Sequence, residues 1–143
     1  MKFGETFDKN KLEGWKYIRY KALKNLIKAS TTEVKQEETG KNMPHWSAIF
    51  LSQLILQIED VNTFFLGMER MLQQRCQDYD KTKDLNGLMA KQISKLMKDL
   101  CSYVVLNYLA VRDVLVLYHT ISKTRRHTPD TPNTGTQDHE ETR

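Results

Sequence analysis

Two long stretches of apolar residues, repeated at alternating steps of three and four, constrain the fold of this chain most. Such spacing places the apolar side chains along one side of an α-helix, as in a heptad seam. We therefore expect one long helix over residues 46–79 and a second over residues 89–121. The first seam comprises Leu51, Leu54, Ile58, Val61, Phe65, Met68 and Leu72, and it is widened by Phe50, Ile55, Phe64 and Met71. The second comprises Met89, Ile93, Leu96, Leu100, Tyr103, Asn107, Ala110, Val114, Leu117 and Ile121.

The segment between the two stretches, "DYDKTKDLNG" at residues 78–87, is typical of a turn. Two long helices joined by a short connection favour an antiparallel pair. Asn107 lies on the second seam, where a polar residue commonly fixes the helix register or caps a kink, at some cost in stability.

A shorter helix is expected before this pair, because residues 12–29 also show helical spacing. Its apolar positions are Leu12, Trp15, Ile18, Ala22, Leu26 and Ala29, widened by Leu23 and Ile27. Residues 30–45 are polar and contain Gly40 and Pro44, which predicts a linker. Residues 127–143 contain no large apolar side chain, which predicts a disordered polar tail after one domain at 1–126.

The stretch "NYLAVRDVLVLYHT" at residues 107–120 is apolar on nearly every side and raises the question of a membrane span over 100–118. Such a span would place Arg112 and Asp113 within the hydrocarbon, where each charge costs about 2.5–3.5 kcal/mol near a helix centre. We therefore expect a buried helix of a soluble protein and no transmembrane segment. The chain starts without an apolar signal region, and Cys76 and Cys101 form no disulfide framework, which together favour the cytoplasm.

The net charge of +4 is unevenly distributed. Residues 1–30 contain eight Lys and Arg against three acidic residues, a balance of +5, and residues 85–126 contain seven against two, also +5. Two basic regions that are separate in sequence can meet in space and form one anion-binding surface. The alternative is that both are ordinary solvated helix faces.

Motifs of enzymes and metal sites are absent from the sequence. It has no glycine-rich phosphate loop, no HExxH and no paired His or Cys ligands, and its four histidines are dispersed. We therefore expect no enzyme activity, no metal site and no cofactor. The basic stretches carry neither a known reader motif nor interleaved aromatic residues, so no nucleic-acid partner is expected.

Four segments, taken together and in order, resemble the SPX domain family over residues 1–123. "MKFGETF" at the start resembles its N-terminal signature, and "YIRYKALKNLIK" at 17–28 resembles its Tyr-x-x-Tyr-Lys-x-Leu-Lys segment. "IEDVNTFFLGMERMLQQR" at 58–75 resembles its central helix, and "LCSYVVLNYLAVRDVL" at 100–115 its Tyr-x-x-Leu-Asn-x-x-Ala-x-x-Lys segment. The resemblance implies an all-α fold in which an N-terminal helical hairpin docks on two long antiparallel helices.

The resemblance also implies a regulatory domain in phosphate homeostasis and signalling that binds inositol polyphosphates or pyrophosphates. A protein partner in phosphate signalling or transport would accompany it, in the cytoplasm or at the cytosolic face of a membrane. Tyr20 and Lys24 match the ligand-contacting Tyr and Lys of the family. Lys21 and Lys28 are neighbours whose charges could add to the attraction for the same ligand, and Lys2 lies in the N-terminal signature.

The sequence departs from the family in its last helix, which typically reads Lys-Ile-Leu-Lys-Lys-x-Asp-Lys. Here "DVLVLYHT" at 113–120 replaces the four lysines by Asp113, Val116, Leu117 and Thr120. Losing several charged hydrogen bonds, at about 1.5–3 kcal/mol each, would weaken or abolish ligand binding. Lys123, Arg125 and Arg126 could substitute from one turn further along.

The alternative is a helical module for protein–protein interaction that no longer senses a ligand. If Val116 and Leu117 are exposed together, they form an apolar patch that favours partner binding. If both are buried, ligand binding is favoured instead.

Overall fold

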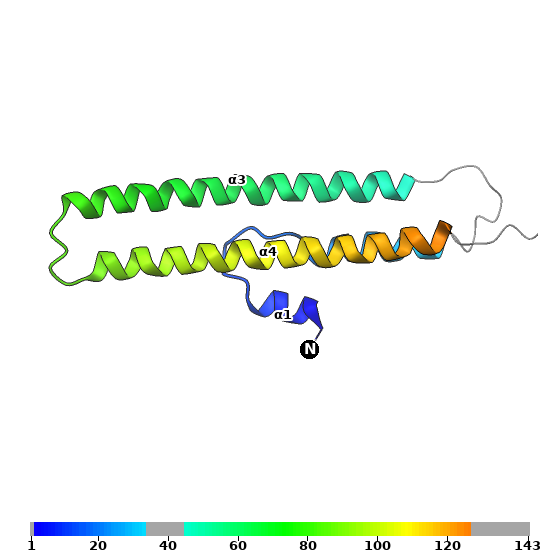
Figure 1. The fold of residues 1–143 in the computed structure, drawn as a ribbon, viewed down its shortest axis with the longest axis horizontal. Coiled ribbons are helices and arrows are strands. Elements are labelled where there is room, and N and C mark those ends of the chain that lie inside the picture. The colour runs from blue at the N-terminus through cyan, green and yellow to red at the C-terminus, as the bar shows by residue number, and fades with distance from the viewer. Residues whose placement is uncertain (1, 34–44, 127–143) are drawn as a thin grey trace, which may run out of the picture.

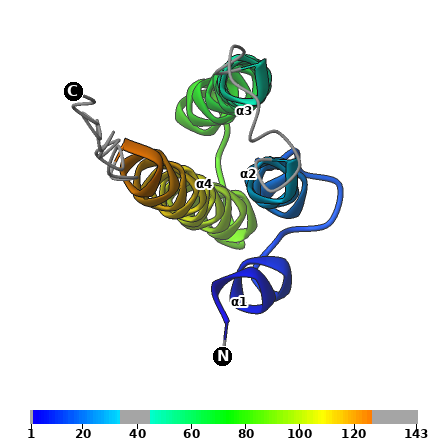
Figure 2. The same cartoon turned by 90° about the vertical axis from the view of Figure 1, so that its right-hand side faces the viewer.

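The structure is a computed structural model that describes residues 2–33 and 45–126. Within these ranges it consists of four helices without strands: α1 (Phe3–Lys9), α2 (Tyr20–Glu33), α3 (His45–Lys81) and α4 (Leu88–Arg126). The two long helices α3 and α4 lie side by side and antiparallel (Figure 1). α2 lies against this pair, and α1 lies below α2 and α4 (Figure 2). The predicted all-α fold with two long packed helices is confirmed.

The connection between α3 and α4 is shorter than predicted, because α3 continues to Lys81 and only residues 82–87 are non-helical. Gly87 has φ +65°, a left-handed conformation that glycine adopts without steric cost. The Asp84 carboxylate accepts hydrogen bonds from the backbone N–H groups of Met89 (3.4 Å) and Ala90 (3.1 Å). These N–H groups have no partner within the first turn of α4, so Asp84 stabilises the start of that helix.

The helix predicted over 12–29 is wrong before Tyr20, where α2 begins. The backbone N–H of Ile18 donates to Asn107 Oδ1 (2.9 Å), and that of Arg19 donates to Gln57 Oε1 (2.8 Å). The long helices therefore satisfy backbone groups that a helix would otherwise pair internally. Gly14, at φ +77°, also takes a conformation outside the helical region.

The core lies where α2 packs between α1 and the long helices. Its buried members are Phe7, Ile18, Tyr20, Leu23, Ile27, Phe50, Leu54, Ala110 and Val114. The buried side of α2 thus includes Leu23 and Ile27, whereas the predicted stripe members Ala22 and Ala29 are exposed. The predicted linker is also wrong for residues 30–33, which continue α2, while its residues 34–44 and the tail 127–143 lie outside the described residues.

The second seam is confirmed, since its central members from Leu96 to Val114 form the buried line of α4. The first seam is only partly right. Phe50, Leu54 and Gln57 are buried on α3, whereas Leu51 and Ile58 are 38% and 40% exposed. The difference arises because α2 packs against one side of the α3–α4 pair and leaves the other side open (Figure 2).

The apolar stretch of α4 is not a fully buried helix, so the prediction for 100–118 is wrong for part of its circumference. Five of its large apolar residues are exposed: Val104, Val105, Tyr108, Leu115 and Val116. By length and composition alone, both α3 and α4 could cross a membrane, and only 17% and 28% of their most apolar windows are buried. The question raised by this stretch is therefore what covers its exposed side.

Candidate functional site

Tyr20, the first residue of α2, is the centre of the predicted site and is only 3% exposed. Its ring packs edge-to-face against Phe3, with ring centroids 5.0 Å apart. A Cβ added at Gly4 would lie 3.3 Å from the Tyr20 ring, so α1 approaches this closely because Gly4 has no side chain. The contact brings the start of α1, and with it the exposed Lys2, to the start of α2.

The hydroxyl of Tyr20 donates a hydrogen bond to the Asp113 carboxylate of α4. Asp113 is one of the four positions that the resemblance to the SPX family aligns with lysine. Burial, together with this carboxylate, raises the pKa of the Tyr20 hydroxyl above its ordinary value of 10.0. The residue expected to contact a phosphate is therefore already bound to an acidic side chain of the same chain.

Lys24 lies one turn after Tyr20, with its Nζ 5.6 Å from the centroid of the Tyr20 ring, within the range of a cation–π contact. Lys28 follows one turn later and is exposed. Within residues 2–33 and 45–126, neither lysine forms an ion pair. The spacing 21, 24, 28 places all three predicted α2 lysines on one side of the helix.

Lys21 differs from its two neighbours because its ammonium group is paired. Its Nζ lies 2.6 Å from Asp8 Oδ2 of α1, and Lys11 lies 3.0 Å from the other oxygen of the same carboxylate. Hydrogen bonds from Lys21, and to a smaller extent from Lys11, lower the pKa of the Asp8 carboxyl below its ordinary value of 3.8. The charge of Lys21 is thus balanced locally, which leaves Lys24, Lys28 and Lys2 as the predicted site residues without such a partner in the described part.

The four α4 positions that the resemblance aligns with family lysines have separate roles here. Asp113 bonds to Tyr20, and Leu117 is half-buried against the core. Val116 is 60% exposed, and the exposed Thr120 donates through Oγ1 to the Val116 carbonyl (2.9 Å). Val116 and Leu117 are therefore neither buried nor exposed together. Two of the four positions hold α4 against the rest of the fold instead of facing solvent.

Lys123, Arg125 and Arg126, the basic residues expected to substitute for the family's lysines, lie near the end of α4. α2 and α4 run in the same direction and end at the same end of the molecule (Figure 1). Lys123 is exposed there. The side chains of Arg125 and Arg126 lie outside the described residues.

Two polar side chains, Asn107 and Gln57, position the start of α2. The sequence singled out Asn107 but not this role, and it gave no indication of Gln57. Both are buried, at 5% exposure, and both accept a hydrogen bond from the 18–19 backbone. The signal for Asn107 was its place on an apolar seam. No comparable signal existed for Gln57, because the buried line of α3 differs from the predicted seam.

Raising the pH is expected to destabilise the fold through Tyr103, another buried hydroxyl. Its oxygen lies 2.7 Å from the Lys16 carbonyl, and burial raises the pKa of Tyr103 to about 12. Because the unfolded chain ionises first, near 10.0, stability is present below that pH and is lost between 10.0 and about 12. The free energy of unfolding, measured in urea, should be lower at about pH 11 than at about pH 8, and Tyr103→Phe should make this decrease smaller. An equal decrease in both proteins would contradict this assignment.

No three His, Cys, Asp or Glu side chains in the described ranges are placed to hold a metal ion. Comparison with family models, curated proteins and solved structures gives no match for this chain. The family resemblance therefore depends on the quoted sequence segments, and the chemistry of the site depends on the side chains around Tyr20.

Proposed function

We propose that this chain is an SPX-type regulatory domain in phosphate homeostasis that binds inositol polyphosphates or pyrophosphates weakly through a basic surface. The main support is the placement of Lys24 and Lys28 on one side of α2, next to Tyr20 and without ion-pair partners in the described residues. Two ammonium groups one turn apart can contact neighbouring phosphates of one ligand. Lys2, at the start of α1, would supply a third charge.

The same surroundings explain why the binding would be weak. Asp113 places a negative charge beside Tyr20, and Asp8 neutralises Lys21. The remaining lysines are exposed or half-buried, so their attraction for phosphate is screened over about 8–10 Å at physiological salt. Affinity is therefore expected to fall as the salt concentration rises.

Substituting Lys24 by alanine is expected to weaken binding of inositol hexakisphosphate at least tenfold, since a charged hydrogen bond contributes about 1.5–3 kcal/mol. Calorimetric titration at about 0.15 M salt measures the change. The matched control is Lys91→Ala, an exposed lysine near the far end of α4. Absence of binding by the unaltered chain, with its helical circular dichroism intact, would exclude the proposed sensor.

Substituting Asp113 by asparagine is expected to tighten binding of the same ligand by about threefold to fivefold. Asparagine removes the negative charge and keeps an oxygen that can accept the hydrogen bond from Tyr20. The control is Asp80→Asn, which should leave the affinity unchanged. Asp80 is an exposed carboxylate at the C-terminal end of α3. Equal affinities for all three proteins would show that Asp113 does not face the ligand.

A second candidate function is a helical protein–protein interaction module that senses no ligand and acts with a partner in phosphate signalling or transport. It is favoured by the apolar side chains that α4 exposes, including Val105 and Val116, at 55% and 60% exposure. It predicts no heat on titration with any inositol phosphate. We propose for either function a location in the cytosol, without enzyme activity.

A further inference from the structure

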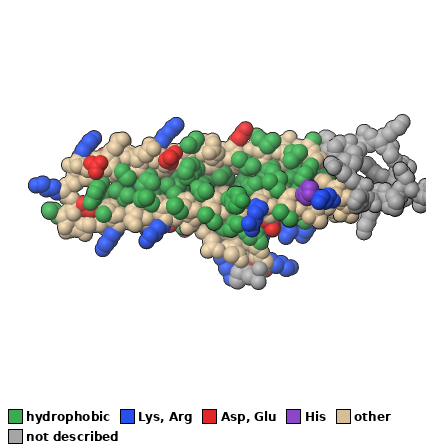
Figure 3. Space-filling view, viewed as in Figure 1, with side chains coloured by type: hydrophobic (Ala, Val, Ile, Leu, Met, Phe, Trp, Pro, Cys, Tyr) green, Lys and Arg blue, Asp and Glu red, His purple; other side chains and the backbone are tan. Residues whose placement is uncertain are grey.

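The side of the α3–α4 pair that α2 does not cover is lined by two regular apolar rows. The α3 row consists of Leu51, Ile58, Phe65 and Leu72, each seven residues from the next. The α4 row consists of Met97, Val104, Val111 and Tyr118, with the same spacing. Together these eight residues are called the open face. Figure 3 shows this side of the molecule as a band of hydrophobic side chains along the two long helices.

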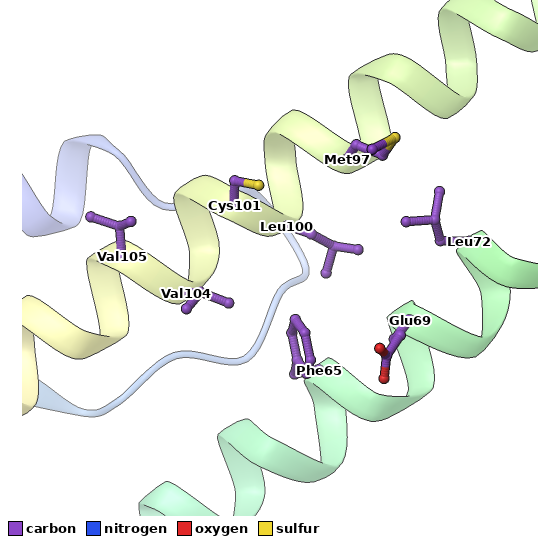
Figure 4. Close-up of a pocket in the computed structure, with 8 residues that line it drawn as sticks. All are labelled: Phe65, Glu69, Leu72, Met97, Leu100, Cys101, Val104 and Val105. Atoms are coloured by element: carbon purple, nitrogen blue, oxygen red, sulfur yellow. The ribbon is translucent and has the colours of Figure 1, made fainter.

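The open face is hollowed and accessible. A cavity of about 420 Å³ lies between Phe65 and Leu72 of α3 and Met97 and Val104 of α4 (Figure 4). A second hollow of about 200 Å³ lies further along, lined by residues that include Ile58 and Val111. Four members of the face, Leu51, Ile58, Val104 and Met97, are 38–51% exposed.

The two rows are in register with each other. Phe65 and Val104 line the same cavity, Ile58 and Val111 line the next, and Phe50, beside Leu51, stacks on Tyr118 at 4.9 Å. A seven-residue repeat in both rows is the pattern of helices that pack lengthwise on further helices. The open face therefore has the shape to bind a partner that consists of two long helices. Among the described helices only α3 and α4 have that length, because α2 has 14 residues.

We propose that the open face binds the open face of a second copy of this chain, related by a two-fold axis parallel to the long helices. Rotation about such an axis keeps each residue at its own level and places α3 of one copy against α4 of the other. Phe65 then meets the partner's Val104, and Ile58 meets the partner's Val111. In such an isologous contact the α3 row of each copy packs on the α4 row of the other, so the same two rows form both halves of the interface.

The area of the open face suits a stable dimer. At 1.5 Å per residue, each row spans about 30 Å, and two adjacent helices are about 20 Å wide. The projected area is about 600 Å², and the true surface is larger because it is hollowed. A specific interface of standard size buries about 800 Å² on each partner.

The charges beside the rows are complementary under the same symmetry. Between its row ends, α3 has three carboxylates, Glu59, Asp60 and Glu69, against one arginine. Over the same levels α4 has Lys98 and Arg112, while its two acidic residues already have partners in Lys95 and Tyr20. Glu69 and Lys98 lie within about 3 Å of one level along the axis, as do Glu59 and Arg112. Two of the three carboxylates of α3, Glu59 and Glu69, would thus lie level with a basic side chain of the partner.

Sedimentation of the full chain over about 1–100 µM tests this proposal. We expect a dimer with a micromolar or tighter dissociation constant. Val104→Glu should raise that constant at least about 100-fold, because it buries a carboxylate in an apolar contact. Val116→Glu is the matched control on the same helix, outside both rows, and should leave the dimer intact. If Val104→Glu loses helicity, Met97→Glu replaces it at a more exposed position.

A monomer at all concentrations would overturn the proposal, and so would a dimer that Val104→Glu and Met97→Glu leave unchanged. If the monomer also cosediments with vesicles of phosphatidylcholine and phosphatidylserine, and Val104→Glu abolishes this binding, the open face is assigned to a lipid surface instead. None of these results depends on inositol phosphate binding, so failure of the dimer and failure of the proposed function can be distinguished.

Discussion

Replacing Phe50 by alanine is expected to lower the free energy of unfolding by about 3–5 kcal/mol. The Phe50 side chain is fully buried and belongs to the core cluster that joins α2 to the long helices. It also stacks on Tyr118, with ring centroids 4.9 Å apart and an interplanar angle of 13°. Alanine would remove this packing and leave a cavity that the surrounding helices can fill only in part.

Urea unfolding followed by circular dichroism measures this loss, and a domain of this size has only about 5–15 kcal/mol in total. Leu56→Ala is the matched control, because Leu56 lies on the same helix but is 53% exposed. It should change the free energy by no more than about 0.5 kcal/mol. Similar losses in both variants would mean that the core is not centred on Phe50.

Replacing Asn107 by leucine is expected to cost about 2–3 kcal/mol of stability and to release the start of α2 from α4. Asn107 Oδ1 accepts the Ile18 N–H at 2.9 Å, and its Nδ2 donates to the Tyr103 carbonyl, also at 2.9 Å. Leucine has nearly the same size but leaves the buried Ile18 N–H without an acceptor. The cost therefore comes from an unsatisfied polar group rather than from lost packing.

Hydrogen exchange of the Ile18 amide tests this assignment directly, alongside urea unfolding. Its protection should fall in Asn107→Leu by more than the change in global stability explains. Asn62→Leu is the control, since Asn62 is an exposed asparagine on α3. Unchanged exchange at Ile18 in the Asn107 variant would show that the segment is held by other contacts.

The positions of the long helices could be predicted closely from the sequence, but the side of α3 that is buried could not. Heptad spacing is a local property, so it predicted both helices and the buried line of α4 through Tyr103 and Asn107. On α3 the same spacing favoured Leu51 and Ile58 as seam members and Phe50 only beside the seam, whereas Phe50 and the unpredicted Gln57 are buried. The difference arises from where α2 packs, which is a long-range contact that periodicity does not contain.

The candidate site shows the same limit. The sequence indicated the lysines of α2, and the family resemblance aligned Asp113 with a lysine. It did not predict that this carboxylate accepts the hydrogen bond of Tyr20, or that Asp8 pairs with Lys21. Both contacts join residues from different helices, and Tyr20 and Asp113 are 93 positions apart. Spacing in the sequence carries no information on such a distance.

The sequence by itself determined that the described part of this chain has an all-α fold, with two long helices around a short connection, because helix formation depends on the spacing and type of nearby residues. Only the tertiary structure decided which apolar side chains are buried and which form the open face. It also decided that residues 15–19 are not helical, since Asn107 and Gln57 bind the N–H groups of Ile18 and Arg19. These outcomes depend on contacts across the fold, where burial and hydrogen bonding override local preference.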